Sequence, residues 1–152
     1  MSEPARVLVI DDEESIRRTV SMALKHAGCV VDTAEDGKRA IEMSEANFYN
    51  LALIDIRLPG MEGTELLTAL KETTPRMVKI ILTGYPALEN AVRGINKGVD
   101  GYLIKPVNTD ELLRFIKESL EKQKHESEYT QQRLAQFVET RIKELQRENE
   151  ET

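Results

Sequence analysis

Short apolar runs recur along the chain between residues 6 and 104, and they limit the folds that it can adopt. Each run is rich in Val, Ile and Leu and predicts a strand, and the segments between the runs have the length and periodicity of helices. The runs cover residues 6–10, 29–33, 51–56, 77–82 and 101–104. Strands that alternate with helices predict an α/β fold, in which helices cover both faces of a parallel sheet.

The segment that follows the first run is the clearest helix. Ile16, Val20 and Leu24 fall on one helical face, and Gly28 supplies a stop just beyond them. Two further helices are indicated by apolar residues at positions 66, 67 and 70 and at positions 91, 92 and 95.

Polar residues follow most of the predicted strands. Asp11 and Asp12 come after the first, Asp55 lies near the end of the third, Thr83 follows the fourth and Lys105 follows the fifth. Ligands of such sheets bind beyond the carboxyl ends of the strands. We therefore expect these side chains to meet at one edge. Asp55 in particular needs a role, because an unpaired charge at the mouth of an apolar strand is costly.

Carboxylates held together at such an edge repel one another and need a cation. Oxygen ligands in a partly open acidic cluster suit Mg²⁺, which also bridges readily to phosphate oxygens. A carboxylate can act as a nucleophile and form an aspartyl phosphate. The Lys105 ammonium and the Thr83 hydroxyl would then neutralise oxygens of the phosphoryl group. This chemistry makes Asp55 the predicted phosphoryl acceptor.

The sequence resembles the receiver domain of two-component response regulators over about residues 4–123. The resemblance is carried by Asp11-Asp12, by Asp55 with the "IRLPGMEG" that follows it, by Thr83-Gly84, and by "GYLIKP", which ends at Lys105-Pro106. It implies a doubly wound, flavodoxin-like sheet of five parallel strands in the order 2-1-3-4-5. It also implies phosphoryl transfer to Asp55 from a sensor histidine kinase or a phosphotransfer protein.

The same resemblance implies a set of magnesium ligands. Asp12 and Asp55 would be side-chain ligands of Mg²⁺, and Asp11 would assist, through water in one arrangement. The backbone carbonyl of Arg57 would complete the ligands that the protein supplies.

A switch is also implied by the resemblance. Lys105 would contact the phosphoryl group, and Thr83 and Tyr102 would form the switch pair. Thr83 would move toward the added charge, and the Tyr102 ring would turn into the space that it leaves. The surface made by the fourth helix (about residues 87–97), the fifth strand and the fifth helix would then change shape.

Beyond Pro106 the chain contains no Gly or Pro and is dominated by Glu, Lys, Gln, Arg and Leu. This composition predicts one long helix that continues from the last helix of the domain, with residues 125–129 as a candidate break. Residues 124–152 are treated as a helical or coiled-coil extension. The chain contains no output module that we identify. It either works alone through protein contacts or forms the N-terminal part of a longer regulator, and its charged, unterminated end favours the second.

A heptad register through this helix gives a seam that is half apolar. The apolar positions are Leu113, Leu120, Leu134, Val138 and Leu145, and the polar ones are Lys117, Lys124, Ser127, Gln131 and Arg141. Such a pattern indicates a weak coiled coil. It is compatible with a homodimer through this helix, whether marginal and regulated or permanent.

The overall composition narrows the classes of function. A net charge of −6 argues against direct nucleic-acid binding, which needs a basic stripe. No apolar run reaches the roughly 18 residues that a membrane span requires, and the N-terminus does not match a secretory signal. The single cysteine, Cys29, fits a reducing compartment. A cytoplasmic protein is the expectation.

Two other functions compete with a phosphoryl-accepting module that assists only its own phosphorylation and dephosphorylation. A phosphohydrolase of the haloacid-dehalogenase type also uses an aspartate nucleophile, Mg²⁺, a hydroxyl and a lysine. That family carries a second aspartate two residues after the nucleophile, where this chain has Arg57. A purely structural dimeriser with an unused site is the third class, and failure of a phosphodonor with Mg²⁺ to label the protein would support it.

Overall fold

The computed structural model describes residues 3–55, 57–58, 61–73, 76–84 and 100–150. Its centre is a five-stranded parallel sheet with strand order β2-β1-β3-β6-β7. The strands are β1 (Arg6–Ile10), β2 (Val30–Ala34), β3 (Leu51–Asp55), β6 (Val78–Thr83) and β7 (Gly101–Ile104). With β6 and β7 as the fourth and fifth long strands, this order is the expected 2-1-3-4-5.

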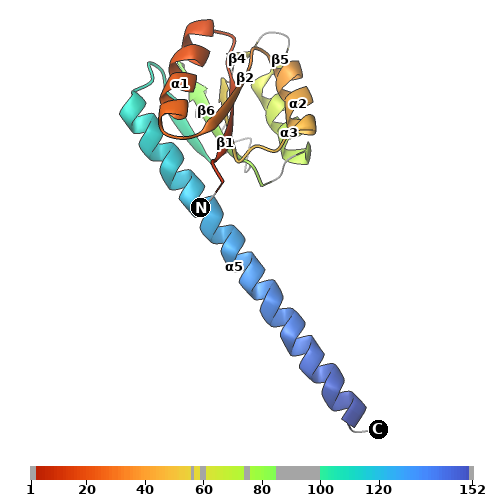
Figure 1. Cartoon of the computed structure of the whole chain (residues 1–152). Helices are drawn as coiled ribbons and strands as arrows, with labels where there is room; N and C mark the ends of the chain where they lie inside the picture. Colours follow the sequence, from red (N-terminus) through yellow and green to blue (C-terminus); the bar gives the residue numbers. More distant parts are fainter. Residues whose placement is uncertain (1–2, 56, 59–60, 74–75, 85–99, 151–152) are drawn as a thin grey trace. The chain divides into compact units, whose positions relative to one another are not determined.

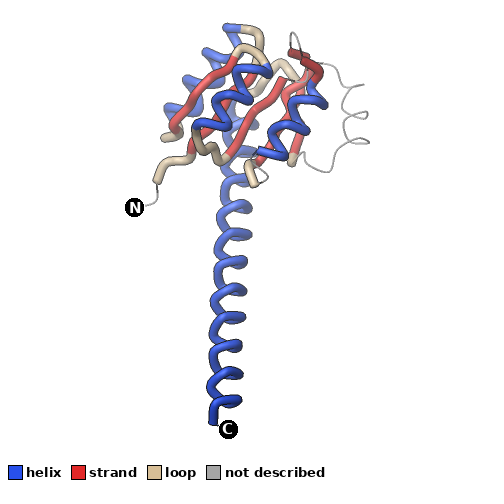
Figure 2. Tube along the Cα trace, turned by 90° about the vertical axis from the view of Figure 1, so that its right-hand side faces the viewer, coloured by secondary structure: helices blue, strands red, loops and turns tan. Residues whose placement is uncertain are grey.

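Helices lie on both sides of this sheet, as expected for a doubly wound fold (Figure 1). They are α1 (Glu14–His26), α2 (Gly37–Ala46), α3 (Gly63–Thr73) and α5 (Thr109–Glu150). The expected helix at residues 87–97 lies outside the described residues. Figure 2 shows the strands running side by side as one layer.

Alternate residues of the strands feed two separate apolar layers. One layer joins the sheet to α2 and α3 through residues such as Ile54, Ala40 and Leu66. The other joins it to α1 and to the first turns of α5 through residues such as Leu24 and Ile116. β1 and β3 are buried on both faces, which explains why their sequences are apolar without interruption.

The strand register places the ends of the strands at one edge. Ile10 pairs with Ile54, so Asp11 and Asp55 each follow directly at the same level. In β6, Leu82 pairs with Asp55. This edge is where the predicted site residues were expected to meet.

One local expectation was wrong, and one small element was not predicted. Residues 125–129 do not break the last helix, because α5 runs without interruption from Thr109 to Glu150 (Figure 2). The absence of Gly and Pro there leaves good helix formers throughout. The unpredicted element is a small antiparallel pair that follows β3, β4 (Arg57–Leu58) with β5 (Met61–Glu62). Strands of two residues are too short to produce a periodic pattern.

The chain divides into two compact units, Met1–Leu120 and Glu121–Thr152. Within the described ranges, none of the helices is long and apolar enough to cross a membrane. In the first unit, Leu112, Ile116 and Leu120 of α5 pack in the layer shared with α1.

Gly101 of β7 lies close beneath Phe115 of α5. A Cβ atom added to Gly101 would overlap the Phe115 ring. We expect Gly101→Ala to lower the free energy of unfolding by about 1–3 kcal/mol, because one extra methyl group displaces a packed aromatic ring. Denaturant unfolding of Gly101→Ala, Phe115→Leu and the double variant measures this. The cost of the alanine should shrink in the Phe115→Leu background, and equal costs in both backgrounds would contradict the steric explanation.

Candidate functional site

Three aspartates converge at the carboxyl edge of the sheet. Asp11 and Asp12 follow β1, and Asp55 ends β3. One carboxylate oxygen from each residue lies within 4.8 Å of the others. Asp11 is fully buried and Asp55 is 5% exposed, whereas Asp12 is exposed to solvent. The site is therefore a carboxylate cluster with two buried members and one open to solvent.

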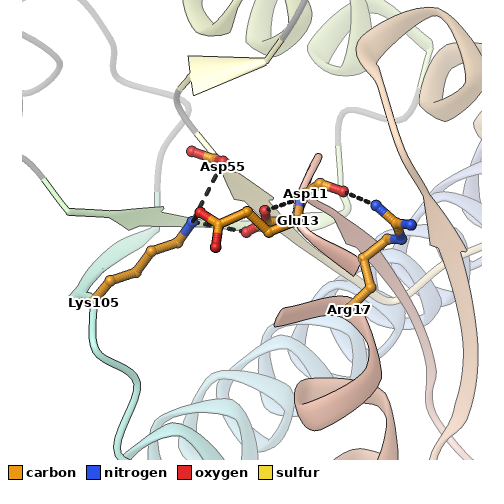
Figure 3. A network of polar contacts seen from close by, with 5 residues as sticks. All are labelled: Asp11, Glu13, Arg17, Asp55 and Lys105. Carbon is orange, nitrogen blue, oxygen red and sulfur yellow. Dashed lines mark hydrogen bonds and ion pairs between the residues drawn. The ribbon is translucent and has the colours of Figure 1, made fainter. Parts of the chain in front are cut away.

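Lys105 lies between the two buried carboxylates (Figure 3). Its Nζ is 2.9 Å from Asp11 Oδ2 and 3.4 Å from Asp55 Oδ2. A third acid, Glu13, places Oε1 at 3.8 Å from the same nitrogen. The lysine directly follows β7, and its peptide bond to Pro106 is cis. Its positive charge offsets the free-energy cost of burying the carboxylates of Asp11 and Asp55.

The charge state of Lys105 follows from two opposing effects. Burial lowers the pKa of its ammonium, while the close contact with Asp11 and the charges of Asp55 and Asp11 raise it. The net effect is a raised pKa, so the carboxylates outweigh the loss of solvent. Lys105 is therefore a permanent cation in this site at neutral pH.

Neighbouring residues fix the position of Asp11. Its Oδ1 accepts a hydrogen bond of 2.9 Å from the Glu13 backbone N–H, and its carbonyl oxygen accepts one of 2.8 Å from Arg17 Nη1 (Figure 3). Glu13 and Arg17 were not predicted as part of the site. In the sequence, only their positions indicate such a role, because Glu13 directly precedes α1 and Arg17 lies in its first turn. The argument from the strand ends does not cover these positions.

The remaining predicted residues are placed to differing extents. Thr83 is the last residue of β6, and its backbone pairs with Ile104, at the same edge as the aspartates. The backbone of Arg57 lies in β4, two residues after Asp55 in the sequence. Tyr102 lies in β7, half-buried, and packs against the apolar layer shared with α2 and α3. The structure thus joins Asp11, Asp12, Asp55 and Lys105 in one cluster.

The donor atoms of this cluster suit a hard divalent cation. All three acidic residues offer carboxylate oxygens, the ligand type that Mg²⁺ prefers. Asp11 Oδ2 is completely buried and makes an ion pair with Lys105 without a well-directed hydrogen bond. A buried carboxylate oxygen without a well-directed hydrogen bond can still accept one or bind a cation. The residues present therefore fit a magnesium site.

Comparison with known families gives one match that covers most of the chain. The response regulator receiver domain family matches residues 7–117. The chain is 34% identical over 111 residues to the probable transcriptional regulatory protein TcrX of Mycobacterium tuberculosis, covering 73% of this chain and 47% of that protein. It is 33% identical over 120 residues to the response regulator ArlR of Staphylococcus saprophyticus, covering 78% and 53%. The chain spans about half the length of these curated relatives.

Solved structures give the same result at the level of the fold. A CheY-like response regulator receiver domain protein from Methanospirillum hungatei is 43% identical, with a TM-score of 0.77 over 82% of this chain and 99% of that chain. The response regulator protein TrrA from Thermotoga maritima, solved in complex with Mg²⁺ and BeF, is 31% identical. Its TM-score is 0.69, over 76% of this chain and 98% of that chain.

Proposed function

Since the chain belongs to the response regulator receiver domain family, we propose that Asp55 accepts a phosphoryl group and that the rest of the cluster supports the transfer. The observation that carries this proposal is the position of Lys105, whose ammonium contacts Asp55 and Asp11 at once. A buried cation beside a carboxylate nucleophile can stabilise the negative charge of the carboxylate before transfer and that of the phosphoryl oxygens afterwards. Asp12 adds a third carboxylate to this cluster on the side that is open to solvent.

The proposed reaction is a transfer from a phosphohistidine of a sensor kinase or a phosphotransfer protein. A carboxylate oxygen of Asp55 forms a bond to phosphorus while the bond from phosphorus to the histidine nitrogen breaks, and the imidazole leaves with the electron pair. The ammonium of Lys105 and the hydroxyl of Thr83 neutralise oxygens of the phosphoryl group. The chain assists its own phosphorylation and dephosphorylation and is not proposed to turn over other substrates.

The metal in this proposal is Mg²⁺. Asp12 and Asp55 would hold it through their side chains, Asp11 would assist, and the carbonyl of Arg57 would complete the protein ligands. When bound, Mg²⁺ supplies positive charge to phosphoryl oxygens. TrrA, a structural neighbour, was solved in complex with Mg²⁺ and BeF, which supports this choice of ion.

Phosphorylation is proposed to act on the rest of the domain through Thr83 and Tyr102. Thr83 ends β6 at the edge that carries Asp55, and Tyr102 is half-buried on the neighbouring strand β7. An added phosphoryl group of about −1.5 to −2 charges would attract the Thr83 hydroxyl and free space for the Tyr102 ring. The surface of the fourth helix, β7 and α5 would then control an output partner or dimerisation.

The proposed setting is the cytoplasm, without membrane insertion and without direct contact between this chain and nucleic acid. A homodimer through the C-terminal helix is part of the proposal, because that helix carries exposed apolar residues. The curated relatives are about twice as long as the part that matches. Their length supports an output that depends on protein segments outside the receiver domain.

Intact-mass measurement tests the proposal directly. With acetyl phosphate and Mg²⁺, we expect the protein to gain the mass of a single phosphoryl group, and with excess chelator we expect almost none. Labelling that is equal with and without Mg²⁺ would contradict the magnesium site. Continuous turnover of a general phosphate ester would instead indicate a hydrolase. No labelling under any condition would indicate that the domain has a structural role alone.

A further inference from the structure

The second unit of the chain presents an apolar stripe along α5. Five large apolar side chains between positions 134 and 145 are 44–69% exposed. They are Leu134, Phe137, Val138, Ile142 and Leu145. Their spacings of three, four, eight and eleven residues from Leu134 place them on one helical face. We propose that this stripe is the contact of a parallel, in-register dimer with a second copy of the chain, a refinement that rests on the dimer in the proposed function.

Within the described part of α5, three residues of this stripe are the only positions of the predicted heptad seam that are both apolar and exposed: Leu134, Val138 and Leu145. Leu113 and Leu120, the first two apolar seam positions, pack against the core of the first unit. Between Leu120 and Leu134, the seam positions are polar. A second copy can therefore meet the apolar seam along Leu134–Leu145, about two heptads, and the dimer it forms is short.

The two apolar residues beside the seam indicate the relative direction of the helices. With Leu134 and Val138 as consecutive d and a positions, Phe137 is a g position and Ile142 is an e position. In a parallel dimer, a g residue faces the e residue five positions later on the other helix. Phe137 of each copy then faces Ile142 of the other, and two apolar pairs enclose the seam.

An antiparallel arrangement gives a worse match of side chains. Aligning Leu134 with Leu145 of the other copy brings Val138 against Arg141 within the seam. It also sets Phe137 against Glu144 instead of Ile142. Burying an aromatic ring against a carboxylate loses the apolar contact and desolvates a charge. The flanking residues thus favour the parallel direction.

Arg141 opposes a tight dimer without reversing that preference. It occupies a seam position, and in a parallel dimer it lies near Arg141 of the other copy. In the structure its Nη1 is 3.1 Å from Glu144 Oε2 on the same helix, at the edge of the stripe. The guanidinium is thereby partly neutralised and drawn toward solvent, and its methylene groups remain at the seam. The result is a weak dimer whose strength depends on additional contacts.

Single cysteines test the direction in the chain of residues 1–152, with Cys29 replaced by Ala. Leu134→Cys and Leu145→Cys proteins are oxidised separately and as a mixture, in the unphosphorylated form and with acetyl phosphate and Mg²⁺. A parallel dimer predicts that each protein forms a disulfide-linked dimer by itself in at least one form. Cross-links that form only in the mixture would show an antiparallel dimer and overturn the proposal. Yields no higher than those of Tyr129→Cys, on the opposite helical face, would overturn it as well.

Charge substitutions provide an independent measurement of the same contact. In the parallel dimer, Phe137→Lys and Ile142→Glu should each raise the dissociation constant about tenfold in sedimentation equilibrium, because each places a charge against an apolar residue. The double variant should recover most of that loss, since lysine then faces glutamate. Tighter dimerisation of Phe137→Lys alone, through Glu144, would refute the parallel direction. Phosphorylation of Asp55, measured by mass on the same samples, separates failure of this contact from failure of the proposed function.

Discussion

Asp55→Asn is expected to abolish phosphorylation by acetyl phosphate in the presence of Mg²⁺, so that the intact mass stays unchanged under conditions that label the wild-type protein. An amide oxygen is a far weaker nucleophile than a carboxylate oxygen, and a neutral amide also removes one negative charge from the cation site. The substitution preserves the size of the side chain. The fold should therefore persist, with the amide oxygen still able to accept from Lys105 Nζ at the position of Asp55 Oδ2.

A control substitution separates loss of the acceptor from a general effect of charge. Asp110→Asn removes one exposed carboxylate in the first turn of α5, outside the aspartate cluster. This variant should be labelled to the same extent as the wild-type protein. Labelling of Asp55→Asn at the wild-type level, with peptide mapping to another residue, would show that Asp55 is not the acceptor.

The parts of the site that were predictable lie on continuous, regular elements. β1 and β3 are apolar runs, and an acid directly after such a run has a fixed position once the strands are parallel and in register. Asp11 and Asp55 follow from that argument, and Lys105 follows from the last strand in the same way. The strand order itself came from the resemblance to receiver domains, because alternating strands and helices allow more than one order.

The parts that were missed depend on local geometry that leaves no periodic trace. Glu13 joins the site through a backbone turn, in which its N–H donates to Asp11 Oδ1, and through a side chain that reaches Lys105. Arg17 reaches the Asp11 carbonyl from within α1. Sequence spacing places both residues near the site, but only the path of the chain between β1 and α1 shows which way they contact it.

The extension shows how packing changes the meaning of a sequence pattern. The heptad register ran through Leu113 and Leu120 as if both belonged to a coiled coil. In the structure these two residues pack against the core of the first unit, beside α1. A seven-residue repeat specifies an apolar face, and it does not distinguish a face covered by the same domain from one covered by another chain.

Lys105→Met is expected to lower the free energy of unfolding by about 3 kcal/mol at neutral pH in the absence of Mg²⁺. The side chain of Lys105 is 15% exposed and neutralises Asp11 and Asp55, so its loss leaves buried carboxylates without a counter-charge. The raised pKa of Lys105 keeps the wild-type ammonium charged between about pH 5 and pH 9. Because this pKa is raised above its value in the unfolded chain, the deficit of the variant should be fully present at neutral pH and shrink only as the pH rises through the pKa of the folded protein.

The same substitution should strengthen Mg²⁺ binding, because the ammonium and the metal ion would both neutralise Asp11 and Asp55. Titration calorimetry should give a lower dissociation constant for Mg²⁺ in Lys105→Met than in the wild-type protein, and added Mg²⁺ should recover much of the lost stability in denaturant unfolding. Lys38→Met removes an exposed lysine from α2 and should change neither quantity. Weaker Mg²⁺ binding in Lys105→Met would mean that the lysine organises the carboxylates for the ion, and the competition inferred from its contact with Asp11 Oδ2 would then be wrong.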